Sequence, residues 1–252
     1  MHLSIVIPAF NEAKYIEHTI KRIQHALIDI KEPRLTWEII VCDNNSTDQT
    51  AEIATRAGAI VIHEPVQQIA RARNKGAGVA KGEWLLFIDA DTYPSQGLMK
   101  EVQGIIESNG YIGCGTTIQV EDGTLFNKLR MERLNPLFRL LKLCGGAFLL
   151  CRKEAFVSIS GFSTRLYAYE EIDFVLRLKK EGRKQNRTFK IIHQHPAITS
   201  GRKGGYDLGS IMKLFSSNFA AVLLFGLNYV LPKSWMEWLG TRLLGFWYNE
   251  RL

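Results

Sequence analysis

The sequence predicts an α/β fold in which a mostly parallel β-sheet carries helices on both faces. Short apolar runs alternate with amphipathic segments through the first half of the chain. Single helices between consecutive strands imply right-handed crossovers and parallel strands. Polar clusters follow three of the apolar runs directly, as expected where ligands bind beyond the carboxyl ends of such strands. The 252 residues are enough to bury a sizeable core.

The alternation can be followed from the N-terminus. Leu3–Pro8 reads as a buried strand, and Asn11 is a suitable cap for a helix whose apolar residues recur every three or four positions from Ile16 to Leu27. The further elements expected in this half are strands at Trp37–Cys42, Ala59–His63 and Trp84–Ile88, and helices at about 49–57 and Ala70–Lys81.

The second half of the chain is less regular. Leu125–Leu143 is amphipathic and basic, so we expect a helix there that Pro136 breaks or kinks. From about residue 206 the chain is apolar and aromatic, which divides it into a domain over 1–205 and a helical tail over 206–252. The other expected elements are strands at Ile112–Val120, Gly145–Leu150 and Lys190–His193, and a helix at Tyr169–Glu181.

The formal charge of +7 is unevenly distributed. Residues 1–127 hold 11 Lys and Arg against 16 Asp and Glu, whereas residues 128–252 hold 21 against 9. On charge alone, nucleic acid, a phosphorylated substrate and a membrane surface are all candidate partners of the basic half. For any single Lys or Arg, a solvated surface is the simpler interpretation. The four cysteines form no C-x-x-C pair and are expected to be buried free thiols in a reducing cytosol.

The tripeptide Asp89-Ala90-Asp91 follows the apolar strand that ends at Ile88. Two carboxylates so close together repel each other, and a divalent cation removes that repulsion while it also binds substrate phosphate oxygens. Mg²⁺ or Mn²⁺ at Asp89 and Asp91 is therefore the functional interpretation. A turn or a helix cap is the structural alternative, because Asp is common in both.

Other side chains are candidates for the same cleft. Asp43 ends a predicted strand and can accept a hydrogen bond from a base or a ribose hydroxyl. Arg71 and Arg73 carry the planar guanidinium that suits a diphosphate, although one of them can equally lie on a solvated helix face. Glu171 is a candidate general base, and an acid in the first turn of a helix also suits the helix dipole.

Two candidates lie near the end of the predicted domain. His195 is a candidate metal or phosphate ligand, although a single His is more often structural. Arg202 and Lys203 stand beside glycines and are expected to form a mobile basic loop that closes over a diphosphate.

Six segments along the chain follow one another in a recognisable order. They are Ser4–Glu12, Asp43–Asp48 (compare D-D-x-S-T-D), Ala72–Gly76 with Lys81–Glu83 (A-R-N-x-G and x-G-E), Asp89–Asp91 (D-x-D), Gly145–Phe148 with Gly161-Phe162, and Glu170–Arg177 (E-D-x-D-L-x-x-R). Together they resemble the inverting GT-A glycosyltransferases of the family-2 type, with the order and spacing kept over about residues 3–203.

The resemblance implies a Rossmann-like domain with a nucleotide-sugar half over about 1–120 and an acceptor half over about 121–205. A hexosyltransferase-type enzyme would move a sugar from a nucleoside diphosphate to an acceptor hydroxyl with inversion, using Mn²⁺ or Mg²⁺. Glu171 occupies the place of the catalytic Asp, and Asp91 with Asp89 that of the metal ligands. The implied donor-binding positions are Pro8, Ala9, Glu12, Asp43, Arg73, Asp89 and Ala90. A sugar or lipid-linked acceptor of the cell envelope is expected, and nucleic acid is not.

Two positions depart from the family pattern. Asn44 stands where the family often has a second Asp, which leaves the donor base open between uracil, guanine and thymine. Glu171 is one methylene longer than Asp, and positional errors near 1 Å affect catalysis. The chain also lacks a Q-x-x-R-W motif, which argues against a processive polysaccharide synthase.

The tail leaves two interpretations open. Phe219–Leu231 is mostly apolar but shorter than the about 20 residues of a membrane span. The Trp and Tyr residues of the tail lie among Lys and Arg. This mixture suits peripheral binding to a membrane and equally a core or homodimer contact. The N-terminus lacks the pattern of a secretory signal, so a cytoplasmic protein is expected, with contact to the inner face of the cell membrane under the first interpretation.

Two rival functions explain part of the sequence. Phe87–Thr92 also resembles the D-x-D-x-T motif of haloacid-dehalogenase-type phosphatases, with Thr92 one position early, and Asp89 would then be the nucleophile. In those enzymes the motif ends the first strand, whereas about three strands precede it here. The other rival is a non-catalytic GT-A-like module that binds a sugar or lipid, which the retention of all the acids disfavours.

Overall fold

The computed structural model describes residues 2–28, 35–122, 135–136, 139–166 and 169–201. Most of the helix expected over Leu125–Leu143, the tail expected over 206–252, and Arg202 therefore lie outside the described residues. Among the helices within these ranges, none combines the length and the apolar character of a membrane span.

The described chain folds around an eight-stranded sheet in the order β3-β2-β1-β4-β7-β6-β8-β5. Strands β1 to β4 are parallel to one another, as are β6 and β8, whereas β7 and β5 run antiparallel to their neighbours. The expectation of a mostly parallel sheet is confirmed. The strands are β1 His2–Ala9, β2 Thr36–Asp43, β3 Ile60–His63, β4 Trp84–Ile88, β5 Thr92–Tyr93, β6 Tyr111–Val120, β7 Phe148–Arg152 and β8 Thr188–Thr199.

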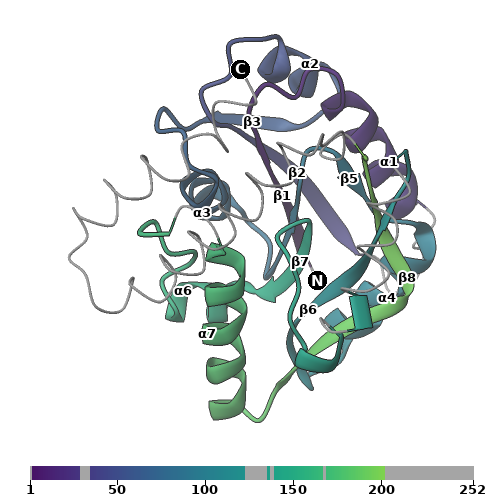
Figure 1. The fold of residues 1–252 in the computed structure, drawn as a ribbon, viewed down its shortest axis with the longest axis vertical. Coiled ribbons are helices and arrows are strands. Elements are labelled where there is room, and N and C mark those ends of the chain that lie inside the picture. The colour runs from purple at the N-terminus through teal and green to yellow at the C-terminus, as the bar shows by residue number, and fades with distance from the viewer. Residues whose placement is uncertain (1, 29–34, 123–134, 137–138, 167–168, 202–252) are drawn as a thin grey trace, which may run out of the picture.

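Helices cover both faces of the sheet (Figure 1), and each face has its own apolar core. Alternate residues of β1 separate the two cores, because Ile5 and Ile7 belong to one and Val6 to the other. The helices are α1 Ile16–Ile28, α2 Thr50–Arg56, α3 Ile69–Val79, α4 Gln96–Glu107, α6 Lys153–Ser158 and α7 Glu170–Lys184.

One face is closed by α1, α2 and α4. The apolar stripe predicted from Ile16 to Leu27 packs on β1, and α4 adds Leu98, Met99 and Val102 to the same core. Helix α4 was not expected from the sequence. Its N-cap Ser95 accepts a hydrogen bond from the Leu98 N–H at 3.1 Å, so a capping signal was present.

The other face is closed by α3, α6 and α7. Phe162 and Phe174 stack with their ring centroids 4.2 Å apart, and Phe87 of β4 meets Phe162 edge-on at 5.0 Å. Helix α3 lies close to the sheet at Gly76, where a Cβ would come within 2.4 Å of the Val6 side chain. The residues that follow β4 and those that begin α7 are therefore held by one packed aromatic cluster.

Candidate active site

The predicted site residues gather at the carboxyl ends of β1, β2 and β4. The order β3-β2-β1-β4 reverses direction between β1 and β4, and open α/β sheets bind ligands at such a switch point. Pro8 and Ala9 are buried at the end of β1, and Asp89 directly follows β4. Three strands precede β4, the strand that Asp89 follows, as the sequence indicated.

The loops after β1 and β2 are joined by side chains of one loop that bond backbone groups of the other. Asn11 Oδ1 accepts from the Thr47 N–H at 2.8 Å, and the Asn11 N–H donates to Ser46 Oγ at 3.0 Å. The Glu12 N–H donates to Thr50 Oγ1 at 2.8 Å, and Glu12 itself is buried. Asn11 has φ 53°, in the left-handed region that Asn tolerates. These bonds fix the turn that contains Glu12, one of the predicted donor-binding positions.

Asp43 lies at the end of β2 inside this frame. Its Oδ1 accepts from the Ser46 N–H at 3.3 Å, and its Oδ2 lies 3.3 Å from His63 Nδ1 at the end of β3. The Asp43 carboxylate is therefore held at the carboxyl end of β2, next to the turn after β1.

The Asn44 side chain accounts for one departure from the family pattern. Its amide Nδ2 donates to the carbonyls of Glu64 and Val66 at 3.1 and 2.6 Å, and its Oδ1 accepts from the Gln68 N–H at 2.9 Å. Asn44 is buried, and an Asp carboxylate could not supply the two donated bonds. Asn44 thus joins β2 to the segment before α3, which is a structural role.

The tripeptide after β4 is held through its backbone. The Ala90 carbonyl accepts from Thr19 Oγ1 of α1 at 2.7 Å. Asp91 Oδ2 accepts from Ser200 Oγ at 2.9 Å, and the Ser200 N–H donates to the Asp91 carbonyl at 3.1 Å. Ser200 therefore positions Asp91 across 109 residues of sequence, a role that the sequence gave no signal for.

Arg73 connects β4 to helix α7. Its Nη2 donates to Asp89 Oδ1 at 3.1 Å, and its Nη1 donates to Glu170 Oε1 at 2.9 Å. The Arg73 side chain is only 2% exposed. A Cβ on Gly146 would lie 2.0 Å from Nη2, so glycine is required for the guanidinium to occupy this place. We predicted Arg73 at the donor, and the structure buries it between two carboxylates.

Helix α7 begins with two adjacent carboxylates in different surroundings. Glu170 is buried, and its pKa is raised to about 8 by that burial and by the Glu171 carboxylate, against the opposing effect of Arg73. Glu171 is half-buried. Its negative charge acts on both Arg73 and the buried Cys144 thiol. Glu170 is thus a buried partner of Arg73, while Glu171 keeps some access to solvent.

Tyr169, at the N-cap of α7, adopts φ 61° and ψ 17°. A bulky residue in the left-handed region costs on the order of 1 to 3 kcal/mol, and such strain is concentrated at functional sites. The strained residue, Tyr169, directly precedes the two carboxylates Glu170 and Glu171.

The carboxylates after β4 suit a hard divalent cation. Magnesium is commonly held through one or two carboxylates together with substrate phosphates, and Asp89 and Asp91 supply such a pair. Within the described ranges, no three or more His, Cys, Asp or Glu side chains gather as a metal site. His195 lies instead against α4, where its Nδ1 is 2.9 Å from Glu101 Oε1. The structure therefore does not bring His195 together with the two predicted Asp ligands.

Comparison with known proteins identifies the family. Residues 4–206 match the family described as Glycosyl transferase family 2. The chain belongs to this family. Members of family 2 are glycosyltransferases, and the match extends over both halves of the predicted domain. Neither the match nor the fold supports the phosphatase alternative.

Relatives of this family-2 chain differ from it in length. An uncharacterized glycosyltransferase of Haemophilus influenzae is 26% identical over 189 residues, covering 71% of this chain and 62% of that protein. An undecaprenyl-phosphate 4-deoxy-4-formamido-L-arabinose transferase of Pectobacterium atrosepticum is 32% identical over 151 residues, covering 55% of this chain and 43% of that protein. The chain thus spans less than two thirds of the length of these curated relatives.

A solved structure shares the fold of this family-2 chain. Glucosyl-3-phosphoglycerate synthase from Mycobacterium tuberculosis, in complex with Mn²⁺ and uridine-diphosphate-glucose, superposes with a TM-score of 0.59 at 18% identity. The similarity covers 88% of this chain and 77% of that one. At this identity the likeness concerns the fold, which is the GT-A fold expected from the sequence.

Proposed function

We propose that this family-2 glycosyltransferase moves a hexose from a nucleoside-diphosphate sugar to an acceptor hydroxyl with inversion at the anomeric carbon. One observation carries the proposal. Arg73 joins Asp89, at the donor end of the sheet, to Glu170 at the start of α7, and Glu171 is the next residue. A carboxylate pair for the donor and a candidate base are therefore parts of one connected cluster.

The donor nucleotide would lie over the β1 and β2 loops. Pro8, Ala9 and Glu12 would line it from β1, and Asp43 from β2, where their mutual bonding keeps the loops in place before a ligand arrives. The small side chain of Ala90 would allow the donor to come close to the backbone. The related fold of a synthase in complex with uridine-diphosphate-glucose supports a donor of this class.

A divalent cation would be held by Asp91, with Asp89 as the second carboxylate. When bound, Mn²⁺ or Mg²⁺ would neutralise charge on the diphosphate as it leaves the sugar. Arg73 would act as a positioning residue, because its two ion pairs fix the Asp89 carboxylate relative to α7. Ser200 would do the same for Asp91. Arg202, outside the described residues, stays a prediction as a further diphosphate contact.

Glu171 would be the general base. An inverting transfer needs a carboxylate on the side of the sugar opposite the leaving diphosphate, able to take the proton of the attacking hydroxyl. Glu170 is unsuited to this role, since it is buried and occupied by Arg73. Glu171 is half-buried and next in sequence, so it can face an acceptor.

The acceptor class follows from the relatives and from the charge of the chain. The Pectobacterium atrosepticum relative is named for transfer to undecaprenyl phosphate, and the second half of this chain is strongly basic. We propose a lipid-linked or cell-envelope glycan acceptor, met by a cytoplasmic enzyme at the inner face of the membrane.

A donor-binding screen tests the proposal. UDP-, GDP- and dTDP-sugars are added to the whole chain with and without Mn²⁺, and the shift of the thermal unfolding midpoint is measured. One nucleotide is expected to stabilise the wild type in a Mn²⁺-dependent way. Asp91→Asn should remove the Mn²⁺ dependence, and Asp122→Asn, at an exposed position, should leave it unchanged. Equal stabilisation of the wild type without any divalent cation would rule out the metal-dependent mechanism.

A further inference from the structure

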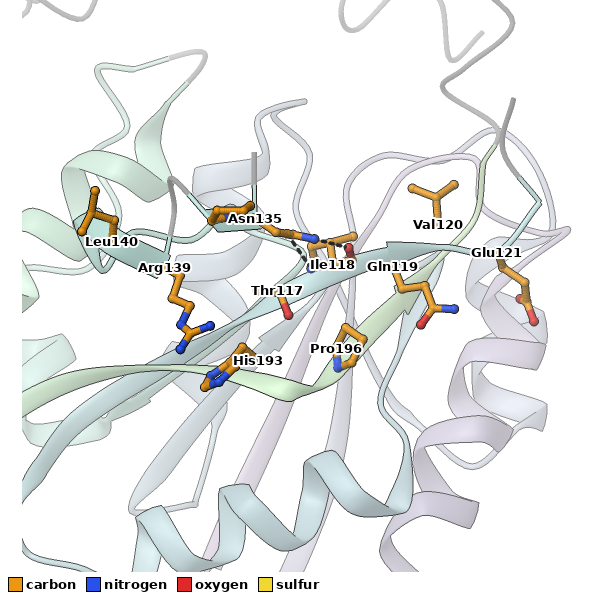
Figure 2. Close-up of a pocket in the computed structure, with 11 residues that line it drawn as sticks. Thr117, Ile118, Gln119, Val120, Glu121, Asn135, Arg139, Leu140, His193 and Pro196 are labelled. Atoms are coloured by element: carbon orange, nitrogen blue, oxygen red, sulfur yellow. Dashed lines mark hydrogen bonds between the residues drawn. The ribbon is translucent and has the colours of Figure 1, made fainter. Parts of the chain in front are cut away.

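A hollow of about 1030 Å³ lies on the half of the sheet formed by β6 and β8, away from the β1 and β2 loops. Figure 2 shows Thr117 and Gln119 of β6, His193 and Pro196 of β8, and Asn135 and Arg139 from the segment that lies over them. The proposed donor site and base account for none of these side chains.

A guanidinium and an imidazole point into the hollow. Arg139 and His193 are exposed and extend toward the same space (Figure 2), and neither side chain has a hydrogen-bond or ion-pair partner among the described residues. Glu121, a carboxylate at the rim, is bonded by the Tyr93 hydroxyl. An imidazole and a guanidinium that face one hollow, and form no ion pair with a carboxylate of the described residues, favour an anionic ligand.

The walls of the hollow are held in place by backbone bonds. The Asn135 amide donates to the Ile118 carbonyl at 2.9 Å and accepts from the Ile118 N–H at 3.1 Å. Between Thr116 and Ile118 the pairing of β6 with β8 is irregular, and Thr116 Oγ1 donates to the Ile192 carbonyl at 3.1 Å. Such irregularities redirect side chains next to active sites.

Along the chain, both segments that line the hollow continue to residues that contact the proposed catalytic site. Beyond Pro196, β8 ends at Thr199, and the next residue, Ser200, bonds Asp91. On the other wall, the segment after Arg139 reaches Gly146, which packs on the Arg73 guanidinium. The same two segments that line the hollow therefore also supply the residues that hold Asp91 and Arg73 in the proposed site.

We propose that this hollow binds a phosphate group of the acceptor, with Arg139 as its main ligand and His193 as the second. The inference rests on the proposed function, because it specifies the acceptor of the same transfer. The guanidinium offers two parallel N–H donors to phosphate oxygens, and the imidazole adds a third donor from β8. The acceptor would be bound through its phosphate while a hydroxyl of the same molecule gives its proton to Glu171 and attacks the sugar, and the nucleoside diphosphate leaves.

The test measures phosphate binding with the donor site already filled. The whole chain is saturated with Mn²⁺ and the nucleoside diphosphate that stabilises it, so that a phosphate probe cannot be bound in the donor's place. Citronellyl phosphate and glucose 1-phosphate are then titrated by calorimetry, with citronellol as the uncharged control. Citronellyl phosphate binding alone would indicate a lipid phosphate, and glucose 1-phosphate binding a soluble sugar phosphate.

Arg139→Ala is expected to weaken the binding of the phosphate probe about 10- to 100-fold, the effect of losing a hydrogen-bonded charge. Arg139→Lys should retain part of the affinity, and His193→Ala should lose less than Arg139→Ala. Arg183→Ala, an exposed position on α7, is the matched control and should change nothing. Nucleotide affinity should be the same in all variants, which also shows that they are folded.

Binding of neither phosphate probe, equal binding to the wild type and Arg139→Ala, or binding only in the absence of nucleotide would overturn the assignment. A wild-type chain that binds no nucleoside diphosphate at all would instead remove the proposed function, and this inference with it.

Discussion

Two regions of the site are held together by different interactions. In the loops after β1 and β2, polar side chains such as Asn11 and Asn44 bond backbone groups. Between β4 and α7, charged side chains bond one another, with Arg73 buried between Asp89 and Glu170. The loss of a neutral hydrogen bond costs about 1 kcal/mol, whereas breaking a buried ion pair costs about 3 to 5 kcal/mol. The donor loops should therefore tolerate substitution better than the charged junction.

Replacing Arg73 should have the largest effect. Arg73→Met leaves the buried Glu170 and the half-buried Asp89 without their cation, so the free energy of unfolding should fall by about 3 to 5 kcal/mol. Urea unfolding at pH 9 measures this loss, because Glu170, with its pKa raised to about 8, is ionised there. Arg71→Met, on the same helix but only half-buried, is the control and should cost less than about 1 kcal/mol. Adding Glu170→Gln to Arg73→Met should restore part of the loss; no restoration would contradict the pairing.

Asn44→Asp tests the donor side at its most constrained position. The variant loses both donated bonds and brings a carboxylate against two carbonyl oxygens, so a loss of about 2 to 4 kcal/mol is expected. Asn45→Asp is the same change at an exposed neighbouring residue and should be nearly neutral. Equal unfolding midpoints for the two variants would mean that the Asn44 amide is not needed as a donor.

Glu170 makes stability depend on pH. Its pKa is raised to about 8 in the folded chain by burial and by Glu171, above the ordinary value of 4.5. The folded state therefore binds the proton more tightly than the unfolded state, and the stabilisation is fully present below about pH 4.5 and lost as pH rises through about 8. The wild type should lose on the order of 1 to 3 kcal/mol relative to Glu170→Gln over this range. A difference that stays constant with pH would mean that Arg73 keeps Glu170 ionised throughout.

The smallest expected effect concerns the reactivity of the four cysteine thiols. All four are free and buried, as the sequence predicted. Burial raises the pKa of Cys42 to about 12 and raises the pKa of the other three thiols as well. Because the thiolate is the reactive form, the native chain should not react with a disulfide reagent at pH 7.5, and all four should react in denaturant. Rapid reaction of one thiol in the native state would contradict its burial.

The sequence predicted those features of the fold and the site that depend on local residue patterns. The strand at Trp84–Ile88 agrees with β4 at both ends, and the clustering of Asn11, Asp43 and Asp89 follows from parallel strands alone. Helix α4 was missed although its Ser95 cap and apolar spacing are legible in the sequence. The strand expected to end at His193 extends to Thr199 as β8, past Pro196, because the pairing with β6 is irregular there.

Contacts between residues distant in sequence could not be predicted. No local pattern indicates that Ser200 bonds Asp91, or that Glu170 rather than a donor phosphate would engage Arg73. The same holds for His195, whose partner Glu101 lies on the helix that was missed. Sequence reasoning identified the chemistry of the site, and tertiary packing decided which charges are paired.

The central claim is that Glu171 is the base of a sugar transfer from a nucleotide donor. The most direct test is nucleoside diphosphate release from the stabilising donor with Mn²⁺ and a phosphate-bearing acceptor, comparing Glu171→Gln with Glu181→Gln. Both residues lie on α7, about 15 Å apart along its axis. Glu171→Gln should lower the turnover by about 100- to 10,000-fold with donor affinity unchanged, and Glu181→Gln should retain wild-type turnover. Wild-type turnover in Glu171→Gln would contradict the account.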